Sequence, residues 1–364
     1  MQINNISDRI MIDNDDGMAT FLSRIGAGTR IGLDTEFMRE RTYFARLCLL
    51  QVALDGQQMA CIDPLTVDSI GLGRMLGNLD AEFIAHSAGQ DIDVLSGATG
   101  FIPDTLFDTQ IAAAFAGIGD QISYAALVNE LLGVQLEKGE TRTDWARRPL
   151  TTAQLDYAFD DVAHLHAVAE ILTERLHRTD KLKWCLRACQ EQVSNYRHAA
   201  VDQWINRFKQ GPSVPIEDQS LLRELLLWRE SEARSSDRPR EWIIASNNLI
   251  AIAHMRPESM AHLREVGHLN DAQMRKYAHN LLKLVQNADK TLEDKVIWPP
   301  RTELDANQKG ALKELQKRLR QYCEDLEIFP TVIASRADLE ARLLGRPNRL
   351  DSGWRQEFVD NALG

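Results

Sequence analysis

Two acidic residues stand in a short apolar stretch of this 364-residue chain, and their spacing suggests metal chemistry. Asp34 and Glu36 lie within Arg30–Phe37, which is typical of a buried strand. Because successive side chains of a strand point to opposite faces, the two carboxylates share a face, roughly 6.6 to 6.8 Å apart along the strand. They repel each other unless solvent, hydrogen-bond donors or a hard divalent cation offsets the charge. The alternative is an edge strand whose polar face meets water.

Three further residues are candidates to complete such a site. Asp91 follows the apolar run 83–88 at the expected change from strand to helix, where scaffolds commonly present site residues. Asp93 is a rival, but a step of two residues along a helix points it in another direction, so only Asp91 is retained. Tyr157 and Asp161 are four residues apart in a helical segment and share a face. The other interpretation of that pair is a buried tyrosine with a solvent-facing aspartate.

The elements that would position these residues follow from the apolar periodicity. A first helix is expected over 16–27. Strands are expected over 30–37, 45–54, 58–62 and 82–86, with Asp55-Gly56 as a hairpin turn. Later helices are expected over 89–95, 108–116, 123–132 and 151–176. Strands first and helices afterwards predict an α/β domain with a mixed sheet covered by helices.

Two breaks divide the chain. Gly211–Pro215 and Trp298–Arg301 carry the glycine and prolines typical of linkers. After the first break the apolar period is helical only, first from Leu221 and then over 311–326 and 336–344. We therefore expect one α/β domain followed by two small all-α modules, with the boundaries 1–205, 213–292 and 303–364.

The composition narrows the class of protein. With 44% hydrophobic and 26% charged residues, it is typical of a soluble globular chain. No run approaches the roughly 18 apolar residues of a membrane span, and no basic start followed by an apolar segment is visible, so a cytoplasmic protein without membrane contact is expected. The net charge of −11 argues against indiscriminate binding of polyanions. It is compatible with a cation-neutralised carboxylate centre and local basic patches that hold phosphates.

Taken together, the acidic positions resemble the motifs of a known nuclease superfamily. Asp34-Thr35-Glu36, Asp91 and Tyr157 with Asp161 are similar to the three motifs of the DEDD 3′–5′ exonucleases, in the tyrosine-bearing branch. The histidine-bearing branch would place a histidine where this chain has Asp156. Longer segments are similar to members of the branch that process RNA and carry helical HRDC domains. These segments are Arg39–Gln51, Cys61–Leu65, Asp108–Gln110 and Thr141–Leu150.

This resemblance implies a ribonuclease H-like mixed sheet flanked by helices, followed by two HRDC-like modules. It implies 3′–5′ trimming of RNA 3′ ends, with tRNA precursors as the expected substrate and 5′-monophosphates as the product. Two Mg²⁺ or Mn²⁺ ions would be held by Asp34, Glu36, Asp91 and Asp161, with Asp34 as the bridge. The chain departs from members of the branch at Ala45, where proline is common, and in its short last module.

The implied chemistry suits these residue types. Two metal ions about 3.5 to 4 Å apart can activate the nucleophile and neutralise the leaving oxygen of a phosphodiester. Hard cations prefer oxygen ligands, so carboxylates suffice and no cysteine is needed. Tyr157 would orient the attacking water, because a tyrosine whose pKa is near 10 is a poor base; the alternative is that it also helps to deprotonate the water, which requires the metals to lower its pKa.

Other residues are candidates for contact with RNA. Thr35 and Phe37 would touch the terminal nucleotide, although Phe37 also fits a core position. Trp145 would stack on a base, and the arginines near it that would contact phosphate are Arg142, Arg147 and Arg148. The other interpretation of this cluster is a helix cap and its packing. In the first helical module the candidates for contact with a duplex or tRNA backbone are Arg234, Arg238, Arg240 and Lys276, although such charges are also typical of a solvated face.

Two other functions fit part of the pattern. A DNA exonuclease or proofreading factor would use the same metals, because only contacts to a 2′-hydroxyl select RNA. An inactive nuclease fold that serves as a nucleic-acid-binding scaffold would be expected to lack a site residue, whereas all four carboxylates and the tyrosine are present. No obligate protein partner is expected.

Overall fold

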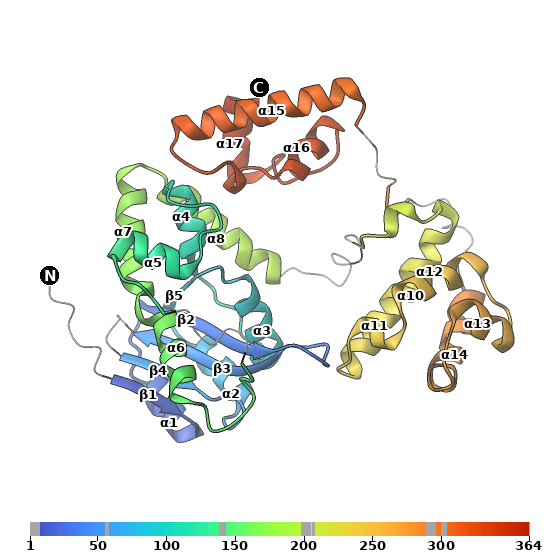
Figure 1. Cartoon of the computed structure of the whole chain (residues 1–364), viewed down its shortest axis with the longest axis horizontal. Helices are drawn as coiled ribbons and strands as arrows, with labels where there is room; N and C mark the ends of the chain where they lie inside the picture. The colour runs from blue at the N-terminus through green and yellow to red at the C-terminus, as the bar shows by residue number, and fades with distance from the viewer. Residues whose placement is uncertain are drawn as a thin grey trace. The chain divides into compact units, whose positions relative to one another are not determined.

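The computed structural model describes residues 8–54, 58–137, 143–197, 205, 208–288, 296–299 and 304–363. This part of the chain forms two compact units (Figure 1). The first unit takes in the chain up to Met38, Arg46–Arg197 and the chain from Leu304 onward. The second takes in Arg39–Ala45 and the described part of 198–303. No helix among the described residues combines the length and apolar character needed to cross a membrane.

A six-stranded mixed sheet lies at the centre of the first unit, in the order β1-β4-β3-β2-β5-β6. Its strands are β1 (Asp8–Ile12), β2 (Thr29–Met38), β3 (Arg46–Leu54), β4 (Gln58–Ile62), β5 (Ala81–Ala85) and β6 (Leu106–Asp108). β3 pairs antiparallel with both β2 and β4, while the other neighbours pair in parallel. The predicted mixed sheet is confirmed, with β1 and β6 as additional strands. The predicted turn at Asp55-Gly56 lies outside the described residues.

Helices cover the sheet. They are α1 (Asp15–Leu22), α2 (Ser69–Gly77), α3 (Gly89–Thr99), α4 (Thr109–Phe115), α5 (Tyr124–Leu132), α6 (Thr152–Ala163), α7 (Leu165–Arg178) and α8 (Leu182–Arg197). The prediction of one helix over 151–176 is wrong, because the chain breaks at His164, where φ is −110° and ψ is 1°. The His164 N–H donates to the Tyr124 hydroxyl oxygen at 3.1 Å. The break lets α6 and α7 cover different parts of the sheet.

The two faces of β2 meet different helices. A Cβ at Gly32 would lie 3.2 Å from Cδ1 of Leu165, so this face of the strand packs against α7. α6 packs across β2, β3 and β4. Thr35 projects to the opposite face and contacts Asp91 in α3. β5 pairs with β2 only as far as Gly32, so the later residues of β2 are open to the chain that follows β5.

The C-terminal segment belongs to the first unit. Its helices are α15 (Ala306–Asp325), α16 (Arg336–Leu343) and α17 (Gln356–Phe358), followed by a π-helical turn over Val359–Leu363. The ring centroids of Phe115 in α4 and Trp354 lie 5.7 Å apart, and those of Trp184 in α8 and Phe358 lie 4.6 Å apart. The sequence predicts 303–364 as a separate module, whereas the structure gives the described part of this segment a hydrophobic core in common with α4 and α8.

The second unit is all-helical around its own core. Its helices are α10 (Ile216–Ser235), α11 (Arg240–Ile243), α12 (Ser246–Met255), α13 (Met260–Gly267) and α14 (Asp271–Gln286). The predicted linker residues take part in this core. The Trp298 indole N–H donates to the Ile205 carbonyl at 2.7 Å, and a Cβ at Gly211 would lie 2.3 Å from the Trp298 ring. A larger residue at 211 would therefore displace the tryptophan.

Candidate active site

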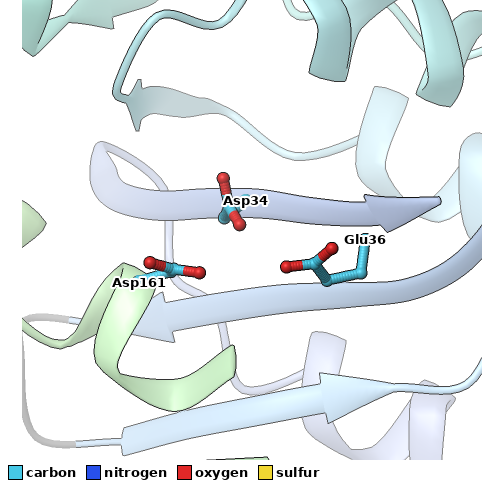
Figure 2. A group of neighbouring side chains, drawn as sticks. All are labelled: Asp34, Glu36 and Asp161. Atoms are coloured by element: carbon cyan, nitrogen blue, oxygen red, sulfur yellow. The ribbon is translucent and has the colours of Figure 1, made fainter. Parts of the chain in front are cut away.

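Three carboxyl groups from two elements meet over the sheet. Asp34 and Glu36 come from β2 and Asp161 from α6, and one oxygen of each lies within 4.8 Å of the others. Figure 2 shows the three side chains directed toward one space. The strand gives Asp34 and Glu36 their common face, as predicted. Asp161 reaches them because α6 crosses β2.

Asp91 lies in the same cleft but is held separately. It stands in the first turn of α3, and its Oδ1 accepts a hydrogen bond of 2.5 Å from the Thr35 hydroxyl. The cleft has a volume of about 550 Å³. Its lining includes all four predicted acidic residues, Thr35, Phe37 and Tyr157, together with His86, Ser87, Gly89, Gln90, Gln192 and Tyr196.

A buried aspartate fixes the loop that delivers Asp91. Asp108, at the end of β6, accepts hydrogen bonds from the backbone N–H groups of Ser87 at 3.0 Å and Ala88 at 2.9 Å. It also caps α4 by accepting from the Gln110 N–H at 2.9 Å. Ser87 adopts a left-handed conformation with φ of 59°, which turns the chain sharply from β5 into α3. Asp108 is therefore a structural carboxylate that sets where α3 begins.

The acidic groups raise one another's pKa. Burial, followed by the charges of Asp91, Asp161 and Glu36, holds the pKa of Asp34 well above its usual value. Burial and the neighbouring aspartates raise the pKa of Glu36 to about 8. Burial likewise raises the pKa of Asp161 to about 7 and that of Asp91 to about 6. The raised pKa values show that the ionised groups destabilise one another, so this all-oxygen donor set fits hard divalent cations, which would offset the charge.

Tyr157 stands beside Asp161 on the same face of α6, as predicted. Its hydroxyl hydrogen-bonds the Asp161 carboxylate, an interaction that lowers the pKa of Asp161 against the larger effect of burial. Burial and the charges of Asp161, Glu36 and Asp34 raise the pKa of Tyr157 above its ordinary value. The hydroxyl is thus protonated at neutral pH and can donate or accept a hydrogen bond at the cleft.

Two of the predicted RNA contacts have structural roles instead. Trp145 is only 2% exposed and packs in the core, with its ring centroid 6.1 Å from that of Tyr157, so it does not offer a face to a base. Arg148 forms a two-pronged ion pair with buried Asp63, at 2.5 and 2.8 Å, and donates to the Cys48 carbonyl at 2.7 Å. The Gln154 side chain in α6 donates a hydrogen bond of 3.2 Å to the Thr143 hydroxyl and so links α6 to this segment. The cap-and-packing interpretation therefore holds for Trp145 and Arg148.

The other predicted contacts of the first unit differ in exposure. Arg147 is exposed, and Arg142 lies outside the described residues. Phe37 is half-buried and lines the cleft, as expected of a residue that contacts a nucleotide. Thr35 is 6% exposed and its hydroxyl is engaged with Asp91, so its side chain positions an acid rather than reaching for substrate.

The predicted cations of the second unit divide into two pairs. Arg240 donates to Glu230 at 2.5 and 2.9 Å and to the Tyr43 hydroxyl, and Lys276 pairs with Glu232 at 2.7 Å. The glutamates partly offset the charges of Arg240 and Lys276, which weakens the case for phosphate contact by this pair. Arg234 and Arg238 are exposed, although the Arg234 guanidinium also lies over the Tyr43 ring at 5.6 Å.

Some residues of the cleft were not predicted from the sequence, among them His86, Gln192 and Tyr196. His86 is half-buried, and its Nε2 donates to the Ile122 carbonyl at 2.9 Å, so it braces the loop after β5. Gln192 and Tyr196 come from α8, which was not predicted. The buried residues Cys185, Cys189 and Val193 recur at four-residue spacing and would have indicated this helix. Gln192 and Tyr196, also four apart, then share another face.

Two known families match parts of this chain. Residues 9–177 match the family model described as "3'-5' exonuclease", and residues 218–285 match that of the HRDC domain. The chain is therefore a nuclease of the 3′–5′ exonuclease class.

Similarity over the whole chain defines the family further. The chain is 37% identical to ribonuclease D of Xanthomonas oryzae pv. oryzae over 91% of each chain, and 33% identical to that of Desulfotalea psychrophila over 90% of each. The crystal structure of Escherichia coli RNase D superposes with a TM-score of 0.83 at 30% identity, covering 97% of this chain and 96% of that one. The chain belongs to the ribonuclease D family, and its activity is that of a 3′–5′ exoribonuclease. The predicted resemblance is thereby confirmed.

Proposed function

We propose that this exoribonuclease trims the 3′ ends of structured RNA, tRNA precursors in particular, and releases 5′-monophosphates. The observation that carries the proposal is the meeting of Asp34, Glu36 and Asp161 in one cleft with Asp91 and Tyr157. The E. coli protein is described as "an exoribonuclease involved in structured RNA processing", which supports the substrate class.

Asp34, Glu36, Asp91 and Asp161 would hold two divalent cations. When bound, the cations supply Lewis acidity toward the scissile phosphate and its leaving oxygen. Thr35 keeps Asp91 pointed toward the cleft through its 2.5 Å hydrogen bond.

Tyr157 would orient the attacking water. In the metal-free protein its raised pKa keeps the proton on the hydroxyl, which favours orientation of water over base catalysis. The Asp161 carboxylate accepts a hydrogen bond from the Tyr157 hydroxyl, which leaves the Tyr157 oxygen able to accept a hydrogen bond from water. Positioning of this kind contributes to rate without any change in the tyrosine's charge.

The test uses a tRNA with a 3′ extension and a DNA oligonucleotide of matched sequence. Each is incubated with the full chain in Mg²⁺, in Mn²⁺ and in chelator. The proposal expects removal of single 5′-monophosphates from the RNA 3′ end in either metal and none in chelator. Equal or faster digestion of the DNA would favour the alternative of a DNA exonuclease, and activity in chelator would remove the metal mechanism.

A further inference from the structure

One buried side chain near the acidic site has no hydrogen-bond partner among the described residues. Gln51, in β3, is 0% exposed. Within the described part of the chain, neither its Nε2 nor its Oε1 has a hydrogen-bond partner. Nearly all buried polar groups in folded proteins are hydrogen-bonded, because an unsatisfied one costs free energy. A completely buried carboxamide with both ends unpaired therefore points to a partner that is available only in another state of the site.

The strand register places this carboxamide beside Asp34. Gln51 is the cross-strand neighbour of Asp34 on β2 and of Cys61 on β4. Directly opposed residues of antiparallel strands project to the same face, with Cβ atoms about 4.5 to 5.5 Å apart. Glu36 is instead opposite Leu49, which offers no polar group. The charge of Asp34 also contributes, after burial, to the raised pKa of the Cys61 thiol, as expected if these residues share a face.

Another buried glutamine shows what a purely structural carboxamide looks like in this chain. Gln219 in α10 is also 0% exposed. Its Nε2 donates to the carbonyls of Val214 and Trp298, each at 3.0 Å. Its Oε1 accepts from the N–H groups of Ile297 and Trp298, each at 2.9 Å. All of its hydrogen-bonding capacity is used within the second unit, in contrast to Gln51.

We propose that Gln51 is a positioning residue whose amide N–H donates to the Asp34 carboxylate when cations occupy the acidic site. A carboxylate that ligates a metal is commonly oriented by a hydrogen bond from a second residue. A carboxamide is suited to this task, because it donates a hydrogen bond to a carboxylate without adding a charge of its own. This role rests on the proposed metal mechanism.

The test replaces Gln51 and measures Mn²⁺ affinity and thermal stability. A structural role and a positioning role predict different changes in these two properties. Gln51→Met keeps the volume and removes the amide. Mn²⁺ binding to the full chain is followed by titration calorimetry, and thermal unfolding is followed in chelator. We expect the Mn²⁺ dissociation constant to rise about 10- to 100-fold. The melting temperature in chelator should stay the same or increase, because an unsatisfied buried group is removed.

Gln219→Met is the matched control, expected to lower the melting temperature in chelator and leave the Mn²⁺ affinity unchanged. If Gln51→Met behaves like this control, the inference is overturned. Gln51→Leu repeats the measurement if methionine perturbs folding. Failure of both Gln51 variants to fold would show that the amide is needed for the structure itself, and would also overturn the inference. Absence of Mn²⁺ binding by the wild-type chain would instead refute the proposed metal mechanism.

Discussion

The Thr35 hydroxyl donates a hydrogen bond of 2.5 Å to Oδ1 of Asp91. Thr35 projects from the face of β2 opposite to that of Asp34 and Glu36, so one strand controls acids on both of its sides. β2 itself carries Asp34 and Glu36, and it holds Asp91 of α3 through the Thr35 hydroxyl. This hydrogen bond explains why Thr35, which lies between the two acids in the sequence, is buried and does not face the substrate.

Thr35→Val is expected to shift the pH dependence of the reaction. The threonine hydrogen bond lowers the pKa of Asp91 against the larger effect of burial, and that pKa is about 6 with the bond present. Its loss raises the pKa further, so the acid limb of kcat/KM should move to higher pH. Rates measured between about pH 5.5 and 9 check this. Thr29→Val, at the start of the same strand, should leave the profile in place, and an unshifted Thr35→Val profile would contradict the assigned role.

Neutralising any of the four acids should abolish turnover. Each of the substitutions Asp34→Asn, Glu36→Gln, Asp91→Asn and Asp161→Asn is expected to lower kcat by about 1000-fold or more, because ligands of one metal site act as a unit. Circular dichroism should show an intact fold. Asp93→Asn serves as the control, since Asp93 is exposed on α3 and should tolerate the change. A more severe loss with Asp93→Asn than with Asp91→Asn would transfer the ligand role to Asp93.

Tyr157→Phe keeps the ring and removes the hydroxyl. We expect kcat to fall by roughly 10- to 1000-fold with Mn²⁺ affinity retained, because water positioning contributes to rate while the carboxylates remain. The lost hydrogen bond also raises the pKa of Asp161 above about 7, so the remaining activity should require higher pH. Single-turnover kinetics measures both effects. Wild-type turnover would exclude Tyr157 from the mechanism.

The metal-free protein should lose stability as the pH rises. The folded-state pKa of Glu36 is about 8, against an ordinary value of 4.5, so the folded state binds more protons than the unfolded state between these values. Unfolding free energy then falls with increasing pH over this window. The melting temperature of Glu36→Gln relative to wild type, measured in chelator, should therefore increase from pH 6 to pH 8. The increase should be absent in saturating Mn²⁺ if the cations offset the same charge.

Arg234 and Arg238 should carry the RNA affinity proposed for the second unit. Each lost phosphate contact reduces the slope of log affinity against log salt by about 0.7 to 0.9. Arg234→Gln and Arg238→Gln are thus expected to weaken binding of a structured RNA and to lower the salt slope, while Lys276→Gln, whose charge is paired with Glu232, should do little. Filter binding at two salt concentrations decides between these outcomes. Unchanged slopes for both arginines would assign them to a solvated face.

The sequence by itself determined the local parts of the site. Asp34 and Glu36 share a face because a strand has a period of two, and Tyr157 and Asp161 share one because a helix nearly repeats every four residues. The β3–β4 hairpin and most helices followed from apolar periodicity for the same reason. These features depend on residues close in sequence, whose relative directions the backbone geometry fixes.

Only the tertiary structure decided which side chains meet in the cleft and which are already engaged in structural contacts. Burial of Trp145, the pairing of Arg148 with Asp63 and the hold of Thr35 on Asp91 join residues that are distant in sequence. The break at His164 depends on a hydroxyl from another helix. The packing of the last segment on α4 and α8 also depends on distant surfaces, because an apolar helix face predicts burial but does not specify its partner.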